Sequence, residues 1–415
     1  MKRKVVSILL SAAMATTMLA GCGSSASSTA SQAADAAAGA ASEVAGAASE
    51  AAGAASEAAG AASEAAGAAS EAADTVASAA SEAATAAGEF AKAAAEAVPD
   101  SIEADSSLAD KKVGVCIYQF ADNFMTLYKT KLEDYLVAMG FSKDNITFAD
   151  GANDQGTQTG QIDNFIADNV DVLIINPVNS SSASTITDKV TAAGIPLVYI
   201  NREPDASEEQ RWADESMKVT YVGCDARQSG TMQGEIISDL GLDKIDFNGN
   251  GKVDYIMIKG DPENVDAQYR TEFSVKALQD AGLEVECLDE EVGMWDQATA
   301  QGLVANALSA HPETEVVFCN NDAMGLGALQ AIEAAGKTVN KDIYLVGVDA
   351  LTEALEDVKA DKFTGTVFND HFAQAYNAAY AAKQFVTGGS NAQYIGCDYV
   401  KVTTDNVDDI LAKVQ

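Results

Sequence analysis

The sequence is poor in basic residues and almost without histidine, and each shortage argues against a class of function. Lysine and arginine number 26 against 62 aspartates and glutamates, which gives a formal net charge of −36. A chain so negative is repelled by phosphate backbones, so nucleic acid is not an expected partner. The two histidines, His311 and His371, stand beside no GxSxG motif and no metal-spaced ligand, so nucleophilic or zinc chemistry has little support.

Cysteine is also scarce, with six residues and no CxxC pair. If Cys22 is modified, as argued below, five remain, and an odd number leaves at least one free thiol in a monomer. Cys116 and Cys319 each lie within an apolar run typical of a strand, and we interpret both as buried thiols. One disulfide among the others stays an open alternative.

Large apolar residues are missing from the first part of the chain, where only Val44 and Val76 occur between Leu19 and Phe90. Such a stretch cannot build a hydrophobic core. It repeats GAASEAA with a period of seven, and the glycine of each repeat costs a helix about 1 kcal/mol. We therefore expect residues 22–110 to form a spacer with partial, fluctuating helix. An alanine-packed coiled coil is the alternative.

The first residues of the chain have the pattern of an export signal. Three basic residues at positions 2–4 precede an uncharged apolar run, which predicts a signal peptide over residues 1–21. The sequence LAGC at positions 19–22 resembles a bacterial lipobox, whose cysteine is acylated and becomes the first mature residue. An ordinary transmembrane helix, the alternative, needs about 20 apolar residues, and this run is barely that long. We expect lipid on Cys22 to anchor the protein outside the cytoplasmic membrane, on the cell surface or the periplasmic side.

From Lys112 onward, short apolar runs alternate with apolar residues at helical spacing. Continuous runs predict strands buried on both faces, and the alternation predicts a parallel, doubly wound sheet. A second series begins after residue 223, so the sequence predicts an α/β fold with two similar lobes. The expected strands are 113–118, 146–148, 172–175, 197–200, 255–258, 283–287, 316–318 and 344–346, and expected helices include 128–139, 158–167, 182–193, 228–240 and 322–336.

Polar side chains gather where these strands are expected to end. In EVVFCNNDA, residues 315–323, a strand runs directly into two asparagines and an aspartate, and open α/β sheets bind ligands at such ends. Carboxylates, amides, one arginine and two aromatics suit a sugar, because planar polar groups bridge hydroxyls while aromatic faces cover C–H surfaces. A helix cap is the alternative for a single residue such as Asp122 or Asp322. The set comprises Asp122, Asn123, Phe124, Asn176, Asn201, Asp266, Arg270, Trp295, Asn321, Asp322, Asp349, Asn369 and Asp370.

Six stretches carry a close resemblance to a known family: IYQFADNFM, YVGCDARQSGTMQGE, GMWD, EVVFCNNDAMG, VGVDALTEAL and GTVFNDH. Over about residues 113–407 the chain resembles the galactose/glucose-binding proteins of bacterial sugar uptake, which are periplasmic binding proteins of type 1. The resemblance implies a binding protein rather than an enzyme, with galactose or glucose between two lobes. The family's histidine two residues before Asp266 is Asn264 here, which bears on the sugar preference. The implied sugar-binding residues are Asp122, Asn176, Asn264, Asp266, Arg270, Asn321, Asp349 and Asn369, with Phe124 and Trp295 stacked on the two faces of the sugar.

The same resemblance implies the organisation of the lobes and the partners. The chain would cross between the lobes near residues 223–225, 369–371 and 399–402, and sugar binding would close the lobes about these hinges. The permease of an ATP-driven (ABC-type) sugar importer is the implied partner, a chemoreceptor is a further candidate, and we expect a monomer. The lobes would comprise residues 111–223 with 371–399 and residues 224–370 with 400–415.

A calcium loop is a second motif. Residues 246–254, DFNGNGKVD, match the first nine positions of an EF-hand loop, but the twelfth position, normally glutamate, is Met257. The resemblance implies that the distant Glu315 completes the site. An Asn/Gly turn without metal is the alternative, and a dockerin-like module would carry the loop twice rather than once. The expected Ca²⁺ ligands are Asp246, Asn248, Asn250, the Lys252 carbonyl, Asp254 and Glu315.

A carbohydrate-active enzyme is the rival class. A cell-surface glycosidase would need two carboxylates in one cleft, and Asp122, Asp266 and Asp349 are the candidates. Turnover of a nitrophenyl galactoside would indicate this enzyme, whereas reversible binding would indicate a receptor. A transcription repressor of the same fold would need an N-terminal DNA-binding helix pair, and the lipobox argues against it.

Overall fold

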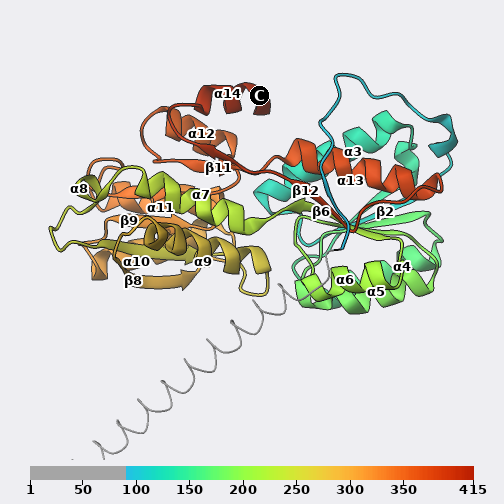
Figure 1. The fold of residues 1–415 in the computed structure, drawn as a ribbon, viewed down its shortest axis with the longest axis horizontal. Helices are drawn as coiled ribbons and strands as arrows, with labels where there is room; N and C mark the ends of the chain where they lie inside the picture. Colours follow the sequence, from blue (N-terminus) through green and yellow to red (C-terminus); the bar gives the residue numbers. More distant parts are fainter. Residues whose placement is uncertain (1–89) are drawn as a thin grey trace, which may run out of the picture. The chain divides into compact units, whose positions relative to one another are not determined.

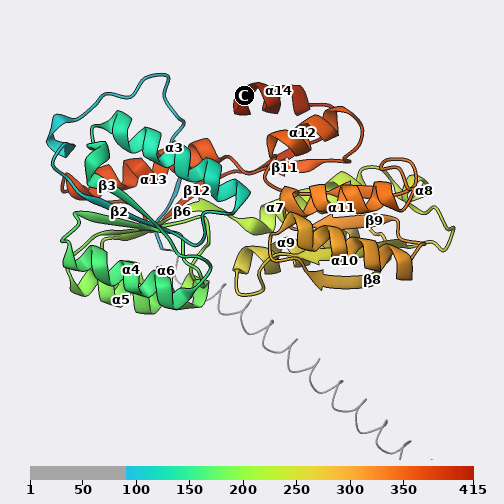
Figure 2. The same cartoon turned by 180° about the vertical axis from the view of Figure 1, so that it is seen from behind.

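The computed structural model describes residues 90–415, which form two lobes, each on its own sheet (Figure 1; Figure 2). The expected signal peptide, the lipidated Cys22 and the glycine-spaced repeat lie outside the described residues. Among the helices of residues 90–415, none combines the length and the apolar character needed to cross a bilayer. The α/β architecture with two parallel-sheet lobes confirms the predicted fold class.

The sheet of the first lobe has seven strands in the order β1-β12-β6-β5-β4-β2-β3, and every pairing is parallel. The central strands are buried along their whole length because helices cover both faces, which explains their unbroken apolar sequences. The strands are β1 (Lys92–Ala94), β2 (Val113–Ile117), β3 (Ile146–Asp150), β4 (Val172–Ile175), β5 (Leu197–Ile200), β6 (Val219–Cys224) and β12 (Tyr394–Cys397).

Helices α3 (Asn123–Met139) and α13 (His371–Val386) pack on one face of this sheet, and α4 (Gln155–Ala167), α5 (Ala183–Ala192) and α6 (Ala206–Asp214) pack on the other. The sequence pattern did not predict α6, because its residues are mostly polar. One apolar anchor, Trp212, is fully buried and stacks on Tyr199 with ring centroids 5.4 Å apart. Short 3-10 turns lie at Ser106–Leu108, Lys143–Asn145 and Ser180–Ser182.

The second lobe has a four-stranded parallel sheet in the order β10-β9-β7-β8 and a short antiparallel pair, β11 with β13. Edge strand β8 runs further than expected, and its acidic, exposed residues protect the open edge from pairing with another chain. The strands are β7 (Val253–Lys259), β8 (Val285–Val292), β9 (Val316–Cys319), β10 (Tyr344–Val346), β11 (Thr366–Phe368) and β13 (Val400–Val402). The helices are α7 (Ala226–Ser238), α8 (Leu242–Ile245), α9 (Val265–Asp280), α10 (Gln297–Ala310), α11 (Asp322–Ala334), α12 (Thr352–Lys359) and α14 (Val407–Val414).

The chain passes between the lobes at three links, which join β6 to α7, β11 to α13 and β12 to β13. These links lie at or next to the three crossings that the resemblance implies. The third is at residues 398–399, slightly earlier than expected, because β13 already begins at Val400.

Residues 90–110 differ from the expected spacer, since they pack on the first lobe. Strand β1 pairs with β12 at the edge of the sheet, and the Asn377 side chain accepts a hydrogen bond from Glu96 N and donates one to Glu96 O, both at 2.8 Å. The Lys92 ammonium lies 4.9 and 5.1 Å from the ring centroids of Phe90 and Tyr394. Further on, Leu108 is fully buried in the core of the lobe. The boundary between spacer and folded lobe in this structure therefore lies well before residue 110.

Candidate functional site

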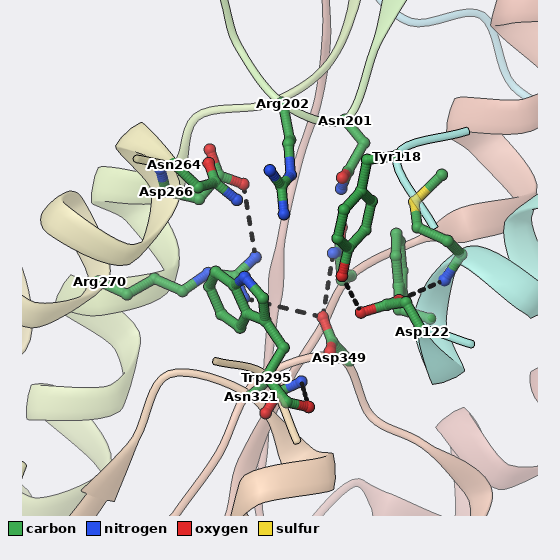
Figure 3. A pocket seen from close by; sticks show the side chains of 13 residues that line it. Tyr118, Asp122, Asn201, Arg202, Asn264, Asp266, Arg270, Trp295, Asn321 and Asp349 are labelled. Carbon is green, nitrogen blue, oxygen red and sulfur yellow. Dashed lines mark hydrogen bonds and ion pairs between the residues drawn. The ribbon is translucent and has the colours of Figure 1, made fainter. Parts of the chain in front are cut away.

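A pocket lies between the two lobes, and most of the residues that line it lie in the loops and helix starts that follow strands (Figure 3). Because the carboxyl ends of both parallel sheets face this space, side chains from loops far apart in the sequence converge on it. The lining residues are Tyr118, Asp122, Phe124, Met125, Asn201, Arg202, Asn264, Asp266, Arg270, Trp295, Asn321, Asp349 and Asn369.

The first lobe contributes an acidic and aromatic wall. Asp122 caps α3 by accepting a hydrogen bond from Met125 N at 2.7 Å, and its other oxygen accepts one from the Tyr118 hydroxyl at 2.7 Å. Asp122 therefore both caps α3 and lines the pocket. Phe124 follows at the start of α3, where its buried ring packs edge-on against His371.

The second lobe contributes a buried charge cluster centred on Arg270. One turn apart on α9, Asp266 and Arg270 approach to 3.7 Å, and Asp349 lies 3.9 Å from the same guanidinium. Arg270 also donates to the Asn320 carbonyl at 2.8 Å and to the Tyr399 hydroxyl at 3.2 Å. These contacts leave the guanidinium plane fixed at the pocket wall.

Amide side chains complete this wall. Asn369 donates to Asp349 at 3.2 Å, which ties the second interlobe link to the charge cluster. Asn321 caps α11 by accepting from Met324 N at 3.0 Å. Asn264 caps α9 by accepting from Asp266 N at 3.0 Å, so it also fixes the direction of the Asp266 backbone.

Four polar atoms at the pocket are buried and have no hydrogen-bond partner among residues 90–415. They are Arg202 Nη2, Asp266 Oδ1, Arg270 Nε and Trp295 Nε1. Burying an unpaired polar group costs about 1–3 kcal/mol, and more for a charged one. A ligand that carries both donors and acceptors would satisfy both the carboxylate and the N–H groups, so the pocket is built for a polyhydroxylated molecule.

Burial also shifts the acidity of two carboxyl groups in the cluster. Desolvation raises the pKa of Asp349 to about 7, against the opposing attraction of Arg270. It raises the pKa of Asp266 to about 6, opposed by Arg270 and then by Arg202. The guanidinium groups therefore only partly compensate the two carboxylates, and near neutral pH these carboxylates hold their charge at a cost in free energy.

Trp295 is held in the pocket by an unusual loop. Met294 and Trp295 have φ values of 53° and 64°, in the left-handed region that side chains other than glycine seldom adopt. The indole lies against Gly260, where an added Cβ would come within 2.1 Å of the ring, so only glycine fits there. The Arg270 guanidinium lies 5.7 Å from the ring centroid. The loop thus holds a flat apolar surface beside the charge cluster.

Nine of the ten sugar-binding residues expected from the sequence line the pocket, and Asn176 does not. Asn176 is fully buried behind the wall, where it accepts from Tyr118 N at 3.2 Å and donates to Ile200 O at 3.1 Å. Its hydrogen-bonding capacity is largely used within the protein, so the structure gives it a supporting position.

Sequence reasoning missed Tyr118, Met125 and Arg202, and it noted Asn201 at a strand end without assigning it to the site. Arg202 is buried, lies 3.7 Å from the Tyr118 ring centroid, donates to the Val178 carbonyl and pairs with Asp261 of the other lobe at 3.3 Å. An arginine directly after Asn201 was the available signal, but its role depends on a partner from the opposite lobe.

The predicted calcium loop lies at the opposite end of β9 from the pocket. Glu315, fully buried just before β9, accepts hydrogen bonds from Phe247 N at 2.7 Å and Asp254 N at 3.1 Å. The Asp246 carboxylate accepts from three backbone N–H groups of the loop, at residues 249, 250 and 251. The distant glutamate and the loop are therefore in direct contact.

The loop residues fit a cation in chemistry. Asp254 Oδ1 is buried without a partner, and within residues 90–415 no lysine or arginine pairs with Asp246, Asp254 or Glu315. In the described part of the chain no three acidic, histidine or cysteine side chains already surround one point. Instead, the amide groups of Asn248 and Asn250 donate to Asp254 at 2.7 and 2.8 Å. Turning these amides would present oxygen atoms in their place.

Comparison with known proteins gives consistent matches. A family model described as "Periplasmic binding protein domain" matches residues 113–390. The D-galactose/methyl-galactoside binding periplasmic protein MglB of Haemophilus influenzae is 33% identical over 323 residues, which are 74% of this chain and 93% of that protein. The ribose import binding protein RbsB of Bacillus subtilis is 28% identical over 255 residues, 61% of this chain and 75% of that protein. An ABC transporter solute binding protein from Bacillus halodurans, crystallised with bound myo-inositol, has a TM-score of 0.65 at 30% identity and covers 74% of this chain and 99% of its own.

The raised pKa of Asp349 predicts that the ligand-free protein becomes less stable as the pH rises. In the folded protein the pKa of Asp349 is about 7, above the ordinary value of 3.8. The contribution of the protonated Asp349 to the stability of the folded state is therefore fully present below about pH 4 and is lost as the pH rises towards 7. Asp349→Asn cannot ionise, so its thermal unfolding midpoint should fall less than that of wild type between pH 5 and pH 8. The exposed Glu272→Gln is the control for removing one negative charge. Identical pH profiles for wild type and Asp349→Asn would contradict the assignment.

Proposed function

The chain belongs to the periplasmic binding protein family and is a sugar-binding component of an ABC importer rather than an enzyme, and we propose that its ligand is galactose or glucose. The glycosidase alternative is set aside because the family captures substrates without converting them. The named ligands of relatives differ, from galactose for the Haemophilus protein to ribose for the Bacillus subtilis protein. The choice of hexose for this chain therefore rests on its own pocket.

The observation that carries the proposal is the set of unpaired polar atoms around one small pocket. Asp266 and Arg270 present an acceptor and a donor one helical turn apart, the arrangement that suits two adjacent hydroxyls of a pyranose. Asp349 and Asn369 offer a second such pair. Trp295 would cover one face of the ring and Phe124 the other, as the resemblance implies.

The sugar preference is proposed to depend on Asn264. Its Oδ1 accepts one hydrogen bond in the cap of α9, and we expect its amide Nδ2, which no residue of 90–415 engages, to meet the ligand. The resembling family carries an imidazole at this position, which has a longer reach. The replacement of this imidazole by the Asn264 amide changes one polar contact among many. We therefore expect the protein still to bind sugar but to differ in its preference between galactose and glucose.

The setting of the protein follows from its family and its leader sequence. The family lies outside the cytoplasm, and we propose that lipid on Cys22 holds this member at the membrane as a monomer. Its partner is the permease of the importer, which receives the closed, sugar-loaded form. A chemoreceptor is a further candidate partner for the same form.

We also propose that one structural Ca²⁺ binds the loop at residues 246–254. The ligands would be Asp246, Asn248, Asn250, the Lys252 carbonyl, Asp254 and Glu315. When bound, the ion would offset three carboxylates that no basic side chain of residues 90–415 pairs with. Its effect is on the stability of the second lobe.

Replacing Trp295 tests the sugar site. Trp295→Ala should weaken hexose binding about ten- to a hundredfold, since burial of a large aromatic surface is worth roughly 1.5–3 kcal/mol. Calorimetry with a panel of monosaccharides measures this. Trp212→Phe, in the core of the first lobe, is the matched control and should bind as wild type does. Equal affinity of Trp295→Ala and wild type for every hexose would remove Trp295 from the site.

Replacing Asn264 tests the sugar preference. Asn264→His should change the ratio of glucose to galactose affinity by up to about tenfold, the equivalent of 1.4 kcal/mol. Histidine is a poorer helix cap, so absolute affinities also reflect a loss of about 0.5–2 kcal/mol in stability, and the ratio is the informative quantity. Asn264→Ser keeps a capping oxygen but lacks the amide and serves as the control. A ratio unchanged in both variants would show that this position does not contact the ligand.

Removing calcium tests the loop. Chelator should lower the unfolding temperature of wild type, because a ligand at a hundredfold excess over its Kd stabilises the folded state by about 2.7 kcal/mol. Glu315→Gln should lose most of this calcium dependence, whereas the exposed Glu313→Gln should keep it. Sugar affinity should change less, because the pocket lies at the other end of β9. Equal unfolding temperatures of wild type with calcium and with chelator would overturn the site.

A further inference from the structure

Two cysteines lie side by side where the chain crosses between the lobes. Cys224 is the last residue of β6 and Cys397 the last residue of β12, and the parallel pairing of these strands places them directly opposite each other. In-register residues of neighbouring strands point to the same face of a sheet, and both cysteines belong to the same apolar cluster. Both links that leave these strands lead into the second lobe.

The third crossing reaches the same point. The Cys224 thiol lies 3.7 Å from Asn369 Oδ1, on the link between β11 and α13. The two thiols are almost fully buried, with 3% and 5% of Cys224 and Cys397 exposed. Burial and then a hydrogen bond with the Cys397 thiol raise the pKa of Cys224. All three interlobe links therefore meet at one pair of sulfur atoms.

The other described cysteines have no such neighbour. Cys116 on β2 lies opposite Ala149 and Ile175. Cys319 lies opposite Ile258, and the exposed Cys287 lies opposite Tyr255. Within residues 90–415, strand register therefore brings only the pair at the crossing together.

We propose that Cys224 and Cys397 are joined by a disulfide that staples two of the three interlobe links. Neighbouring strands lie about 4.7–4.9 Å apart, which falls within the Cα separation of about 4.4–6.8 Å that a disulfide spans. The protein belongs to a family that lies outside the cytoplasm, where disulfides form and persist. The inference does not depend on which sugar is bound.

The oxidant is a disulfide, either a small molecule such as oxidised glutathione or the active-site disulfide of an oxidoreductase. One cysteine thiolate attacks it and forms a mixed disulfide, with one oxidant sulfur leaving as a thiol. The second cysteine thiolate attacks the protein sulfur of that bond and releases the other oxidant thiol. Two protein thiols thus lose two electrons and two protons, and one disulfide is reduced to two thiols. Because the packed pair is buried, the exchange takes place while the exported chain is still folding.

Peptide mapping of the full chain tests the staple. The protein is unfolded and refolded with oxidised and reduced glutathione, blocked with iodoacetamide under denaturing conditions and digested without reduction. We expect one cross-linked product that contains Cys224 and Cys397, and alkylated peptides for Cys116, Cys287 and Cys319. Cys116→Ser should give the same cross-link and Cys397→Ser should give none. Alkylation of both Cys224 and Cys397 in the oxidised wild type, or a cross-link between other cysteines, would overturn the proposal.

A second test compares the thermal unfolding of the oxidised and the reduced wild-type protein and requires no substitution. The oxidised protein should unfold several degrees above the reduced protein, because the bond closes a long loop and restricts the unfolded chain. Cys116→Ser should retain this difference. An unchanged midpoint in a sample that mapping shows to be cross-linked would refute the stapling role.

Discussion

The buried guanidinium of Arg270 is the constraint on which the pocket depends. A guanidinium does not give up its proton, so a fold that buries it must surround it with acceptors. The chain supplies Asp266 from the same helix, the Asn320 carbonyl from the end of β9, Asp349 from the loop after β10 and Tyr399 from the third interlobe link. One side chain thereby joins four segments and sets the position of each at the pocket wall.

The charge of this cluster explains why the site suits a neutral, hydroxylated ligand. Asp266 and Asp349 both lie beside the Arg270 guanidinium, and burial raises the pKa of both. Arg202 at the same pocket also attracts Asp266, yet the pKa of both carboxyl groups stays raised, and hydroxyl groups can donate to the carboxylates and accept from Arg270 without adding charge. The pocket therefore carries an electrostatic cost that hydrogen bonds from a hydroxylated ligand would reduce, and the flat Trp295 ring lies beside the charged groups.

The sequence predicted those features that depend on residues near one another in the chain. Asp122, Asn321 and Asp349 could be found because each follows an apolar strand, and the parallel topology then brings strand ends together. The two lobes followed from the repeated strand and helix pattern. Arg202 was not predicted because its position in the pocket depends on an ion pair with Asp261, which lies in the other lobe.

Features that depend on a distant partner were also missed elsewhere. The helix α6 has almost no apolar periodicity and is positioned by the single buried Trp212. Strand β1 has the sequence KAA, which carries no strand signal of its own. It is extended because the edge of β12 offers unpaired backbone groups. The conformations of α6 and β1 are therefore set by their contacts in the fold and not by the preferences of their own residues.

The attachment of β1 to the first lobe has a mechanical consequence. A pull along β1 from the chain before residue 90 would load the ladder between β1 and β12 in shear, so its hydrogen bonds would have to fail together. The paired hydrogen bonds between Asn377 and the Glu96 backbone add resistance at the far end of the strand. This force passes into the sheet of the first lobe and not directly through the link from β6 to α7. If Cys22 carries the proposed lipid anchor, tension from it would thus be borne by the first lobe rather than by this link.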